Sequence, residues 1–496
     1  MRIFGHRGWR LVPGLLLAWG IAGAPVSGTP AARPAHDAFP GEADLPPAQL
    51  TRLGSVLFFV AADADEAPSV WRTDGTAAGT LRVPTLGDPV PGGGDVRILG
   101  QIGQSMVWTA RVPGTLYDRV LFSATESGPR LTLGTYSPAP PASNTRQIDT
   151  PQIIGDRLFF QNCPPAGCRI WSTDGTTAGT GPVSALAQLT ATDQAIMGSL
   201  AGKWLVIRSR QAVFAYDLAA DRVLSLLPQG AQFVEIHPVG ETLFLVTRTE
   251  RSKLWASRLG SPRAAQLFSA TTLDVAGWRG DLLYFAPDGG RLWATDGQPK
   301  HTHPYTGARV ESFSLFADRL GSVGSTTFVP VPGYYLGALY GTDESTHKLR
   351  ELVRVCSYKY ECLGTRMSGV TVAGRQAFET IDHSLWQSDS TPQGTKPHDV
   401  LHLADEKSFA VLGGRLVLGA TSLDGERQLW ETDGTVAGTR ALSDGTLDQP
   451  FIVEGPPVPL GDALVVAAFR EPEGYQLWLV AGGRATPLTA LRHPPQ

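Results

Sequence analysis

The chain has 496 residues, of which 42% are hydrophobic and 18% are charged, with 56 glycines and 38 prolines. Apolar residues recur along the whole chain, which excludes a disordered polar protein and suits many short strands joined by tight turns. The formal net charge of −4 gives no electrostatic support for binding nucleic acid or an anionic membrane surface.

Residues 1–28 are predicted to form a secretory signal peptide. Three arginines (Arg2, Arg7 and Arg10) come before or at the start of the apolar run LVPGLLLAWGIAGA, and Val26-Ser27-Gly28 is suited to cleavage. An uncleaved membrane anchor is the alternative, but the apolar run is shorter than the roughly 20 residues that a membrane span needs. We expect a secreted protein, in the periplasm, at the cell surface or outside the cell, with no integral membrane segment once the signal is removed.

A linker rich in proline and alanine is predicted over residues 29–45, and a repeat domain over residues 46–493. The clearest copies of the repeat are WRTDGTAAGT at Trp71, WSTDGTTAGT at Trp171 and LWETDGTVAGT at Trp430. Weaker copies follow Trp255, Trp293, Trp386 and Trp478, and three more carry Phe122, Phe214 or Tyr340 at that point. From residue 71 to residue 478, nine intervals cover 407 residues, so the mean period is about 45, as in propeller blades.

Residues 145–187 illustrate one repeat unit. The segments TRQIDTPQIIG, DRLFFQN, CRIWSTDG and TTAGTGPVSAL are four extended runs that end at turn residues. A sheet of four short strands cannot cover both of its apolar faces alone, and a closed ring gives every sheet two neighbours. The sequence therefore predicts an all-β fold, a β-propeller of about ten four-stranded units, as a single large ring or two smaller rings.

The two ends of the repeat domain are predicted to form separate sheets. The first unit begins with a first strand near Ala48, and the last unit ends with the fourth-strand segment ATPLTAL. We therefore expect no blade in which one end of the chain donates a strand to the sheet of the other.

The repeated residues have structural explanations. Asp-Gly marks a tight hairpin between the third and fourth strands, because such turns need positive φ, and the aromatic residue is suited to packing between sheets. A calcium loop is the alternative for the aspartates, but each turn offers one aspartate instead of several oxygen ligands. We predict structural roles, and no metal or cofactor, for Trp71, Asp74, Gly75, Trp171, Asp174, Gly175, Trp293, Asp296, Gly297, Trp386, Asp389, Trp430, Asp433 and Gly434.

Four cysteines form two close pairs in the sequence. Cys163 and Cys168 bracket a proline-rich turn, and Cys356 and Cys362 bracket SYKYE. In an exported chain such pairs predict two local disulfides. The alternative is a zinc site with four cysteine ligands, but the spacing within each pair is wider than zinc motifs use.

Two histidine pairs and one acidic group are the other candidate metal ligands. His301 and His303 would share one face of a strand, and His398 and His402 have a spacing that aligns ligands on a helix. Prolines around the first pair favour a loop, and the second pair lies in a predicted strand. Asp63, Asp65 and Glu66 form an acidic group that is best explained as a solvated hairpin tip.

At WRTDGTAAGT, WSTDGTTAGT and LWETDGTVAGT the chain resembles the ELWxxDGT repeat proteins, a group of exported bacterial proteins. The resemblance covers about residues 46–493 and implies a propeller-like β fold and bacterial export, without an established activity. The family's leading glutamate is replaced here by Ser69, Arg169, Arg291, Ser384, Gln428 and Gln476. A role that depended on that glutamate is therefore not expected in this chain.

Two functions remain open from the sequence, beside a purely structural role at the cell surface or in a matrix. The first is a non-catalytic propeller that binds a protein or glycan through its loops, where Tyr334, Tyr335, Tyr358 and Tyr360 could contact a ligand. The second is a propeller hydrolase or lyase acting on an extracellular polysaccharide, with carboxylates from different blades as acid and base. The sequence contains no nucleophile-elbow or phosphate-loop motif, which favours the first function.

Overall fold

The computed structural model describes most of the repeat domain, and Ala43–Gln496 form one compact unit. The described residues are 46–62, 68–83, 95–138, 151–163, 168–187, 195–209, 212–227, 233–261, 263–307, 318–331, 337–355, 369–372, 374–379, 385–404, 408–442, 451–470, 473–482 and 484–491. The predicted signal peptide, the linker, Cys356 and Cys362 lie outside these residues, as do Asp63, Asp65, Glu66 and the four tyrosines named above.

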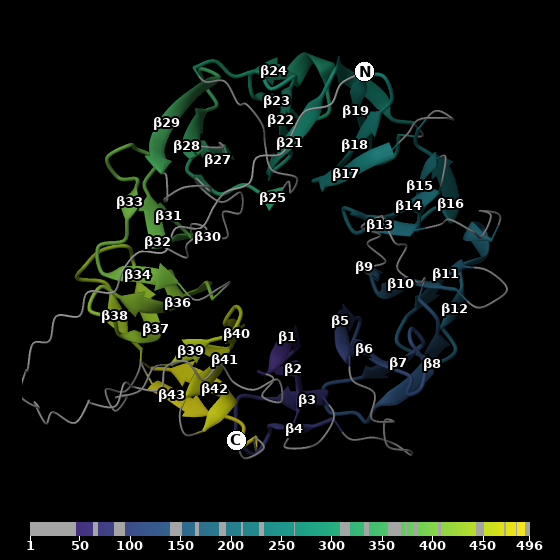
Figure 1. The fold of residues 1–496 in the computed structure, drawn as a ribbon. Helices are drawn as coiled ribbons and strands as arrows, with labels where there is room; N and C mark the ends of the chain where they lie inside the picture. The colour runs from purple at the N-terminus through teal and green to yellow at the C-terminus, as the bar shows by residue number, and fades with distance from the viewer. Residues whose placement is uncertain are drawn as a thin grey trace, which may run out of the picture. The chain divides into compact units, whose positions relative to one another are not determined.

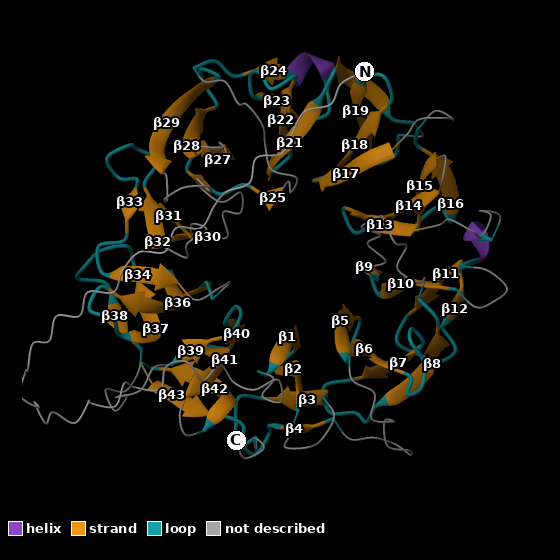
Figure 2. Cartoon of the chain, viewed as in Figure 1, coloured by secondary structure: helices purple, strands orange, loops and turns teal. Residues whose placement is uncertain are grey.

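The described residues form ten antiparallel sheets, numbered here as blades 1 to 10, and Figure 2 shows that strands make up nearly all of their regular structure. The strands are labelled in Figure 1. Blade 1 contains β1 (Ala48–Leu53), β2 (Val56–Ala61), β3 (Ser69–Thr73) and β4 (Leu81–Arg82). Blade 2 contains β5 (Arg97–Ile102), β6 (Ser105–Arg111), β7 (Arg119–Ala124) and β8 (Leu131–Tyr136). Blade 3 contains β9 (Gln152–Ile154), β10 (Arg157–Asn162), β11 (Arg169–Thr173) and β12 (Gly181–Pro182). Blade 4 contains β13 (Ala195–Leu200), β14 (Trp204–Ser209), β15 (Ala212–Asp217) and β16 (Arg222–Ser225). Blade 5 contains β17 (Phe233–Val239), β18 (Thr242–Arg248), β19 (Ser252–Arg258) and β20 (Ala265–Ala270).

The second half of the domain continues in the same order. Blade 6 contains β21 (Leu273–Arg279), β22 (Leu282–Pro287), β23 (Trp293–Thr295) and β24 (His303–Pro304). Blade 7 contains β26 (Ser322–Val323), β27 (Thr326–Val331), β28 (Gly337–Asp343) and β29 (Lys348–Val355). Blade 8 contains β30 (Gly369–Val372), β31 (Arg375–Glu379), β32 (Leu385–Ser388) and β33 (Lys396–Pro397). Blade 9 contains β34 (Leu401–Ala404), β35 (Ala410–Leu412), β36 (Arg415–Ser422), β37 (Arg427–Thr432) and β38 (Arg440–Ala441). Blade 10 contains β39 (Ile452–Val453), β40 (Val458–Leu460), β41 (Ala463–Arg470), β42 (Gly474–Ala481) and β43 (Arg484–Pro487).

Three blades depart from the four-stranded plan. In blades 9 and 10 the first strand is interrupted, so β34 and β35 both pair with β36, and β39 and β40 both pair with β41. In blade 6 the short strand β25 (Asp318–Arg319) adds to β21 in parallel. The plan of four strands a unit is otherwise confirmed across the described part of the chain.

Hydrophobic packing joins each blade to the next. Ten buried clusters lie between the sheets, and each cluster combines residues of two consecutive blades. One of them joins Leu57 and Phe59 of blade 1 to Val465 and Leu477 of blade 10. Blades 5 and 6 also pack on each other, through Phe244 and other residues. The ten blades therefore close into one ring, and not two rings of five.

Among the described strands, none is shared between the two ends of the ring. Blade 1 is built from β1 to β4, and blade 10 is built from β39 to β43. No described strand of one pairs with a described strand of the other. Closure between the two ends of the domain therefore rests on side-chain packing, as the sequence predicted.

The repeated aromatic residues occupy one position on the third strand of each blade. Trp71 lies opposite Phe59 of the second strand and Arg82 of the fourth, and Trp171 is flanked in the same way. Every one of the ten clusters contains one such residue, which packs toward the preceding blade: Trp71, Phe122, Trp171, Phe214, Trp255, Trp293, Tyr340, Trp386, Trp430 and Trp478. Each copy of the sequence repeat thus contributes one aromatic residue to one junction between blades.

Helical structure is scarce in the described residues. The two single-turn 3-10 helices are η1 (Ser184–Leu186), which follows the fourth strand of blade 3, and η2 (Pro299–His301), which lies between the third and fourth strands of blade 6. η1 takes up part of the segment TTAGTGPVSAL, in which the sequence predicted a fourth strand, and β12 is limited to two residues. Among the described residues, no helix has both the length and the apolar character that crossing a membrane requires.

Candidate functional site

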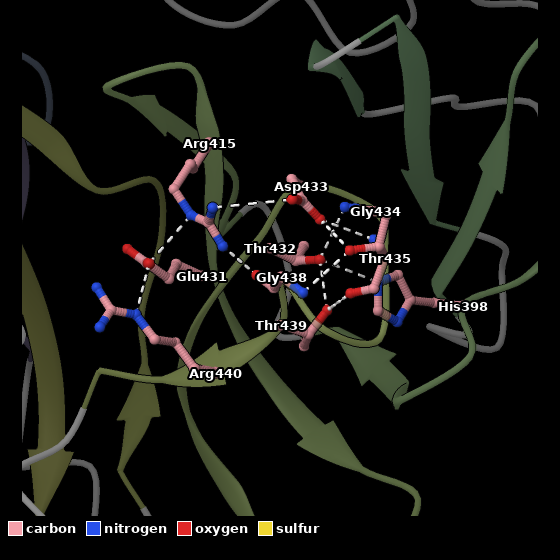
Figure 3. A network of polar contacts seen from close by, with 10 residues as sticks. All are labelled: His398, Arg415, Glu431, Thr432, Asp433, Gly434, Thr435, Gly438, Thr439 and Arg440. Atoms are coloured by element: carbon pink, nitrogen blue, oxygen red, sulfur yellow. Dashed lines mark hydrogen bonds and ion pairs between the residues drawn. The ribbon is translucent and has the colours of Figure 1, made fainter.

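The turn after each third strand is a compact hydrogen-bonded unit, which we call the motif turn. In blade 9, Asp433 Oδ1 accepts hydrogen bonds from the backbone N–H of Thr435 at 2.9 Å and from its hydroxyl at 2.7 Å. Thr432 Oγ1 accepts from the Gly434 N–H at 2.9 Å and lies 2.6 Å from Thr439 Oγ1. Figure 3 shows these side chains turned toward one another. The polar atoms of the motif thus form hydrogen bonds with one another inside the turn.

The same bonds recur in other blades. Asp74, Asp174 and Asp389 each accept from the N–H and the hydroxyl of the threonine two residues later, at distances of 2.6–2.9 Å. The threonine hydroxyl holds the pKa of each of these carboxyls, and of Asp433, below its usual value. A lowered carboxyl pKa here needs no bound cation, because neutral donors already stabilise the charge.

Two glycines make the motif turn possible. Gly434 has a φ of +86°, a region that residues with a side chain avoid. At Gly438 a Cβ would lie 2.0 Å from Asp433 Oδ1, so the second glycine is required by close approach. The same close approach recurs at Gly79, Gly179 and Gly394.

The motif turn also contacts the preceding blade. The Ser123 hydroxyl of blade 2 donates to the carbonyl of Gly175 in blade 3, at 2.7 Å. A Cβ on Gly75 would lie 3.2 Å from Leu460 of blade 10. These contacts place the repeated Asp-Gly pair at the junctions of the ring, next to the repeated aromatic residue.

Charged residues surround the motif turn of blade 9. Arg415 Nε lies 3.0 Å from Glu431 Oε1, and Arg440 Nε donates to the same oxygen at 2.7 Å. Arg415 also donates to the carbonyl of Gly438. Figure 3 shows the three charged side chains on one side of the turn. The glutamate between two arginines is thereby compensated within the blade.

The turn after the third strand of blade 7 departs from the motif turn and contacts blade 6. In blade 7, Glu344 occupies the place of the turn glycine, and its carboxylate accepts from Tyr284 at 2.9 Å and from Tyr305 at 2.5 Å. Both tyrosines belong to blade 6, and burial raises the pKa of each phenol. The backbone adds a further link, because Thr306 N donates to His347 O at 2.9 Å. The junction between blades 6 and 7 is thus joined by phenol–carboxylate hydrogen bonds as well as by hydrophobic packing.

The two histidine pairs considered as metal ligands each have other partners in the structure or lie apart in burial. His301 bonds Asp296 Oδ2 at 2.7 Å, whereas His303 stacks on His347 of blade 7 with ring centroids 3.7 Å apart. His398 is buried, between β33 and β34, and His402 is exposed on β34. Among the described residues, no group of three or more His, Cys, Asp or Glu side chains is arranged to hold a metal ion.

One carboxyl near the first strands has a raised pKa. Burial and the charge of Glu235 raise the pKa of Asp274, against the opposing effect of Arg248. Glu235 lies on β17 and Asp274 on β21, the first strands of blades 5 and 6. His237 Nε2 lies 3.1 Å from Glu235 Oε2. Sequence patterns gave no sign of this group, because its members come from different blades.

Cys163 and Cys168 form a disulfide with Cα atoms 3.8 Å apart, as the sequence predicted. The bond closes the hairpin between β10 and β11 of blade 3. The Cys163 N–H donates to Ser137 O at 2.6 Å, and the Ser137 hydroxyl donates to Asp118 Oδ1 at 2.5 Å. The disulfide hairpin is thus connected to the neighbouring hairpin of blade 2.

That hairpin of blade 2, residues 112–118, exposes two large apolar side chains. Leu116 is 78% exposed and Tyr117 is 45% exposed. The loop is closed by Val112 N donating to Asp118 O at 2.8 Å, and Thr115 bonds back to Val112 O. We call residues 112–118 the blade 2 tip. The repeat pattern does not mark this loop, and the apolar pair between Gly114 and Asp118 is the one signal in the sequence that could have indicated it.

No family model and no curated protein matches the sequence. Among solved structures, the computationally designed Ika8 protein is 13% identical with a TM-score of 0.35, over 66% of this chain and 93% of that one. The Dos1 propeller is 11% identical with a TM-score of 0.36, over 81% and 97%. Dipeptidyl peptidase 4 of Porphyromonas gingivalis is 11% identical with a TM-score of 0.36, over 79% of this chain and 60% of the peptidase. No functional conclusion follows from similarities this low.

Proposed function

We propose that this protein is an exported, non-catalytic β-propeller that binds a protein or glycan ligand through loops at the edge of its ring. The observation that carries the proposal is the blade 2 tip, where Leu116 and Tyr117 are exposed on a loop that hydrogen bonds hold in place. Loops on a rigid scaffold are common binding elements, and an ordered loop loses less entropy on binding. The disulfide of the neighbouring hairpin supports both the ordering and the export.

The chemistry of the motif turns supports recognition over catalysis. Their carboxylates and hydroxyls bond one another, and their glycines sit at blade junctions. The repeated polar residues therefore have structural roles in the described blades. An exposed tyrosine offers a flat apolar face with a hydroxyl, which suits stacking on a sugar or packing against a protein.

The proposal is tested with the double variant Leu116→Ser, Tyr117→Ser of the full chain. A glycan array and a display library of folded protein domains would first identify a ligand for the unaltered protein. The double variant should then bind that ligand at least about tenfold more weakly, the equivalent of about 1.4 kcal/mol, with an unchanged melting temperature. Val436→Ser is the matched control, because Val436 is 63% exposed but lies in a motif turn of blade 9. Equal loss in both variants, or none in the double variant, would refute the proposed site.

One observation favours a second function, a hydrolase or lyase acting on an extracellular polysaccharide. Such enzymes need an acid that keeps its proton beside a second carboxylate, and the raised pKa of Asp274 next to Glu235 is of that kind. A polysaccharide screen would test it. Turnover that Asp274→Asn and Glu235→Gln both abolish would establish the enzyme and displace the recognition proposal.

A further inference from the structure

His398 connects blade 8 to blade 9 through both nitrogens of its ring. Its side chain is buried, with 5% of the residue exposed. Nδ1 accepts hydrogen bonds from the backbone N–H groups of Val400 at 3.2 Å and Leu401 at 3.1 Å, at the start of β34. Nε2 lies 3.3 Å from the Thr432 hydroxyl in the motif turn of blade 9, a contact visible in Figure 3.

These bonds fix the protonation state of the ring. Nδ1 accepts two N–H donors, so it has no proton, and the proton of the neutral imidazole is on Nε2. Nε2–H then donates to Thr432 Oγ1, which also accepts from the Gly434 N–H at 2.9 Å. The folded junction therefore uses His398 as a neutral group.

Protonation of Nδ1 would break this arrangement. An imidazolium presents N–H at both nitrogens, so the N–H groups of Val400 and Leu401 would face a third donor and lose their acceptor. Buried donors without an acceptor destabilise the fold. Leu401 is fully buried in the cluster between blades 8 and 9, so water cannot replace the lost acceptor without opening the junction.

The charges around the ring do not favour the imidazolium. Burial lowers the pKa of His398, with Lys396 and Arg375 acting in the same direction and Asp399 against them. Asp399 is itself paired with Lys396 Nζ at 2.7 Å. From blade 9, the group that meets the ring is the uncharged hydroxyl of Thr432.

We propose that the junction between blades 8 and 9 is an acid-sensitive latch, in which neutral His398 holds the first strand of blade 9 and its protonation releases that strand. The inference is independent of the proposed ligand. Burial holds the folded-state pKa of His398 below the ordinary histidine pKa of about 6.5, so the unfolded chain binds the proton more readily. The stabilisation is complete above pH 6.5 and is lost as the pH falls below it, by up to about tenfold in the folding equilibrium constant per pH unit.

The test compares the full chain with two variants, His398→Asn and His402→Asn. Asparagine places an acceptor near the position of Nδ1 and cannot be protonated, so His398→Asn should keep the bonds to Val400 and Leu401 at every pH. His402 is exposed on β34, four residues after His398, which makes His402→Asn the matched control. Denaturant unfolding from pH 7.5 to pH 5 should show a smaller loss of stability on acidification in His398→Asn than in the unaltered protein and His402→Asn. Identical pH slopes in all three proteins would overturn the latch.

A second measurement uses the unaltered protein and does not depend on how well a variant folds. Amide hydrogen exchange at Val400 and Leu401 should become at least about tenfold faster, relative to the intrinsic rate, between pH 6.5 and pH 5. The NMR titration of the His398 imidazole should give a pKa below 6.5. A pKa at or above 6.5, or unchanged protection at both amides, would contradict the proposal.

Discussion

At the scale of single residues, the motif turn explains why the repeat keeps an aspartate, two glycines and three threonines. Asp433 accepts two bonds from Thr435, and Gly438 approaches the Asp433 carboxylate too closely for any side chain. The residues are interdependent, because the carboxylate fills the space beside the second glycine. The repeated residues therefore specify the conformation of one turn, and this turn contacts the preceding blade.

Gly434→Val should destabilise the protein far more than Asp433→Asn. Valine at a φ of +86° is strained by roughly 1–3 kcal/mol, and its Cβ would lie 2.9 Å from Gln387 Oε1 of blade 8. Asparagine keeps an acceptor for Thr435. Urea unfolding of both variants measures the difference. Equal losses would mean that the Asp433 charge does more than accept these bonds.

Ser390→Gly should stabilise the protein. Ser390 has a φ of +74° at the position that glycine occupies in the other Asp-Gly turns. Relief of that strain, less the entropy that glycine adds to the unfolded chain, leaves a net gain of about 0.5 kcal/mol. Ser345→Gly in the turn of blade 7 is the control and should not stabilise, because Ser345 is not at positive φ. A thermal shift of the same size and sign in both variants would contradict the explanation.

At the scale of elements, the sequence predicted the strands better than the loops between them. Short apolar runs and Asp-Gly turns mark the second and third strands, because both features are local. The fourth strands β4, β12 and β38 have two residues each, since the motif turn uses the residues that would extend them. Glu344 could not be assigned from its neighbours in the sequence, because its partners Tyr284 and Tyr305 belong to another blade.

The disulfide should act on its hairpin and not on the ring. Cys163–Cys168 closes a loop of about six residues, which the chain-entropy model values at about 2 kcal/mol. The double variant Cys163→Ser, Cys168→Ser should therefore melt only a few degrees lower and keep its far-UV spectrum. Hydrogen exchange should rise mainly in β10, β11 and the blade 2 tip, which Ser137 joins to Cys163. A collapse of the whole fold would show that the bond supports the ring itself.

At the scale of the whole molecule, the adjacent residues Phe58 and Phe59 serve different junctions. Phe58 packs between blades 1 and 2, and Phe59 packs between blades 10 and 1, where the two ends of the domain meet. Both side chains are fully buried. The sequence could predict that such junctions exist, because a sheet with two apolar faces needs two neighbours. It could not decide between one ring and two, since no local pattern states which blade the last one contacts.

Phe59→Ala should open the ring where Phe58→Ala does not. Either change should cost about 3–5 kcal/mol, because each leaves a cavity in a packed core. Spin labels on blades 1 and 10 should report a broader distance distribution in Phe59→Ala, and a pair on blades 1 and 2 should do so in Phe58→Ala. If neither variant broadens the distances across blades 10 and 1, the closing cluster is not what holds the ends together.

Closure without a shared strand has a consequence for the order of the chain. Each blade is one continuous segment, and blade 10 contacts blade 1 through the same kind of cluster that joins any other pair. The fold thus depends on the cyclic order of the blades and not on which of them is made first. A circular permutation that links residue 491 to residue 46 and opens the chain between blades 5 and 6, at residues 271–272, would preserve every sheet. Duplication or loss of a complete blade would likewise leave the strands of every other blade together. The number of blades can therefore change more readily than in a propeller whose two chain ends share a blade.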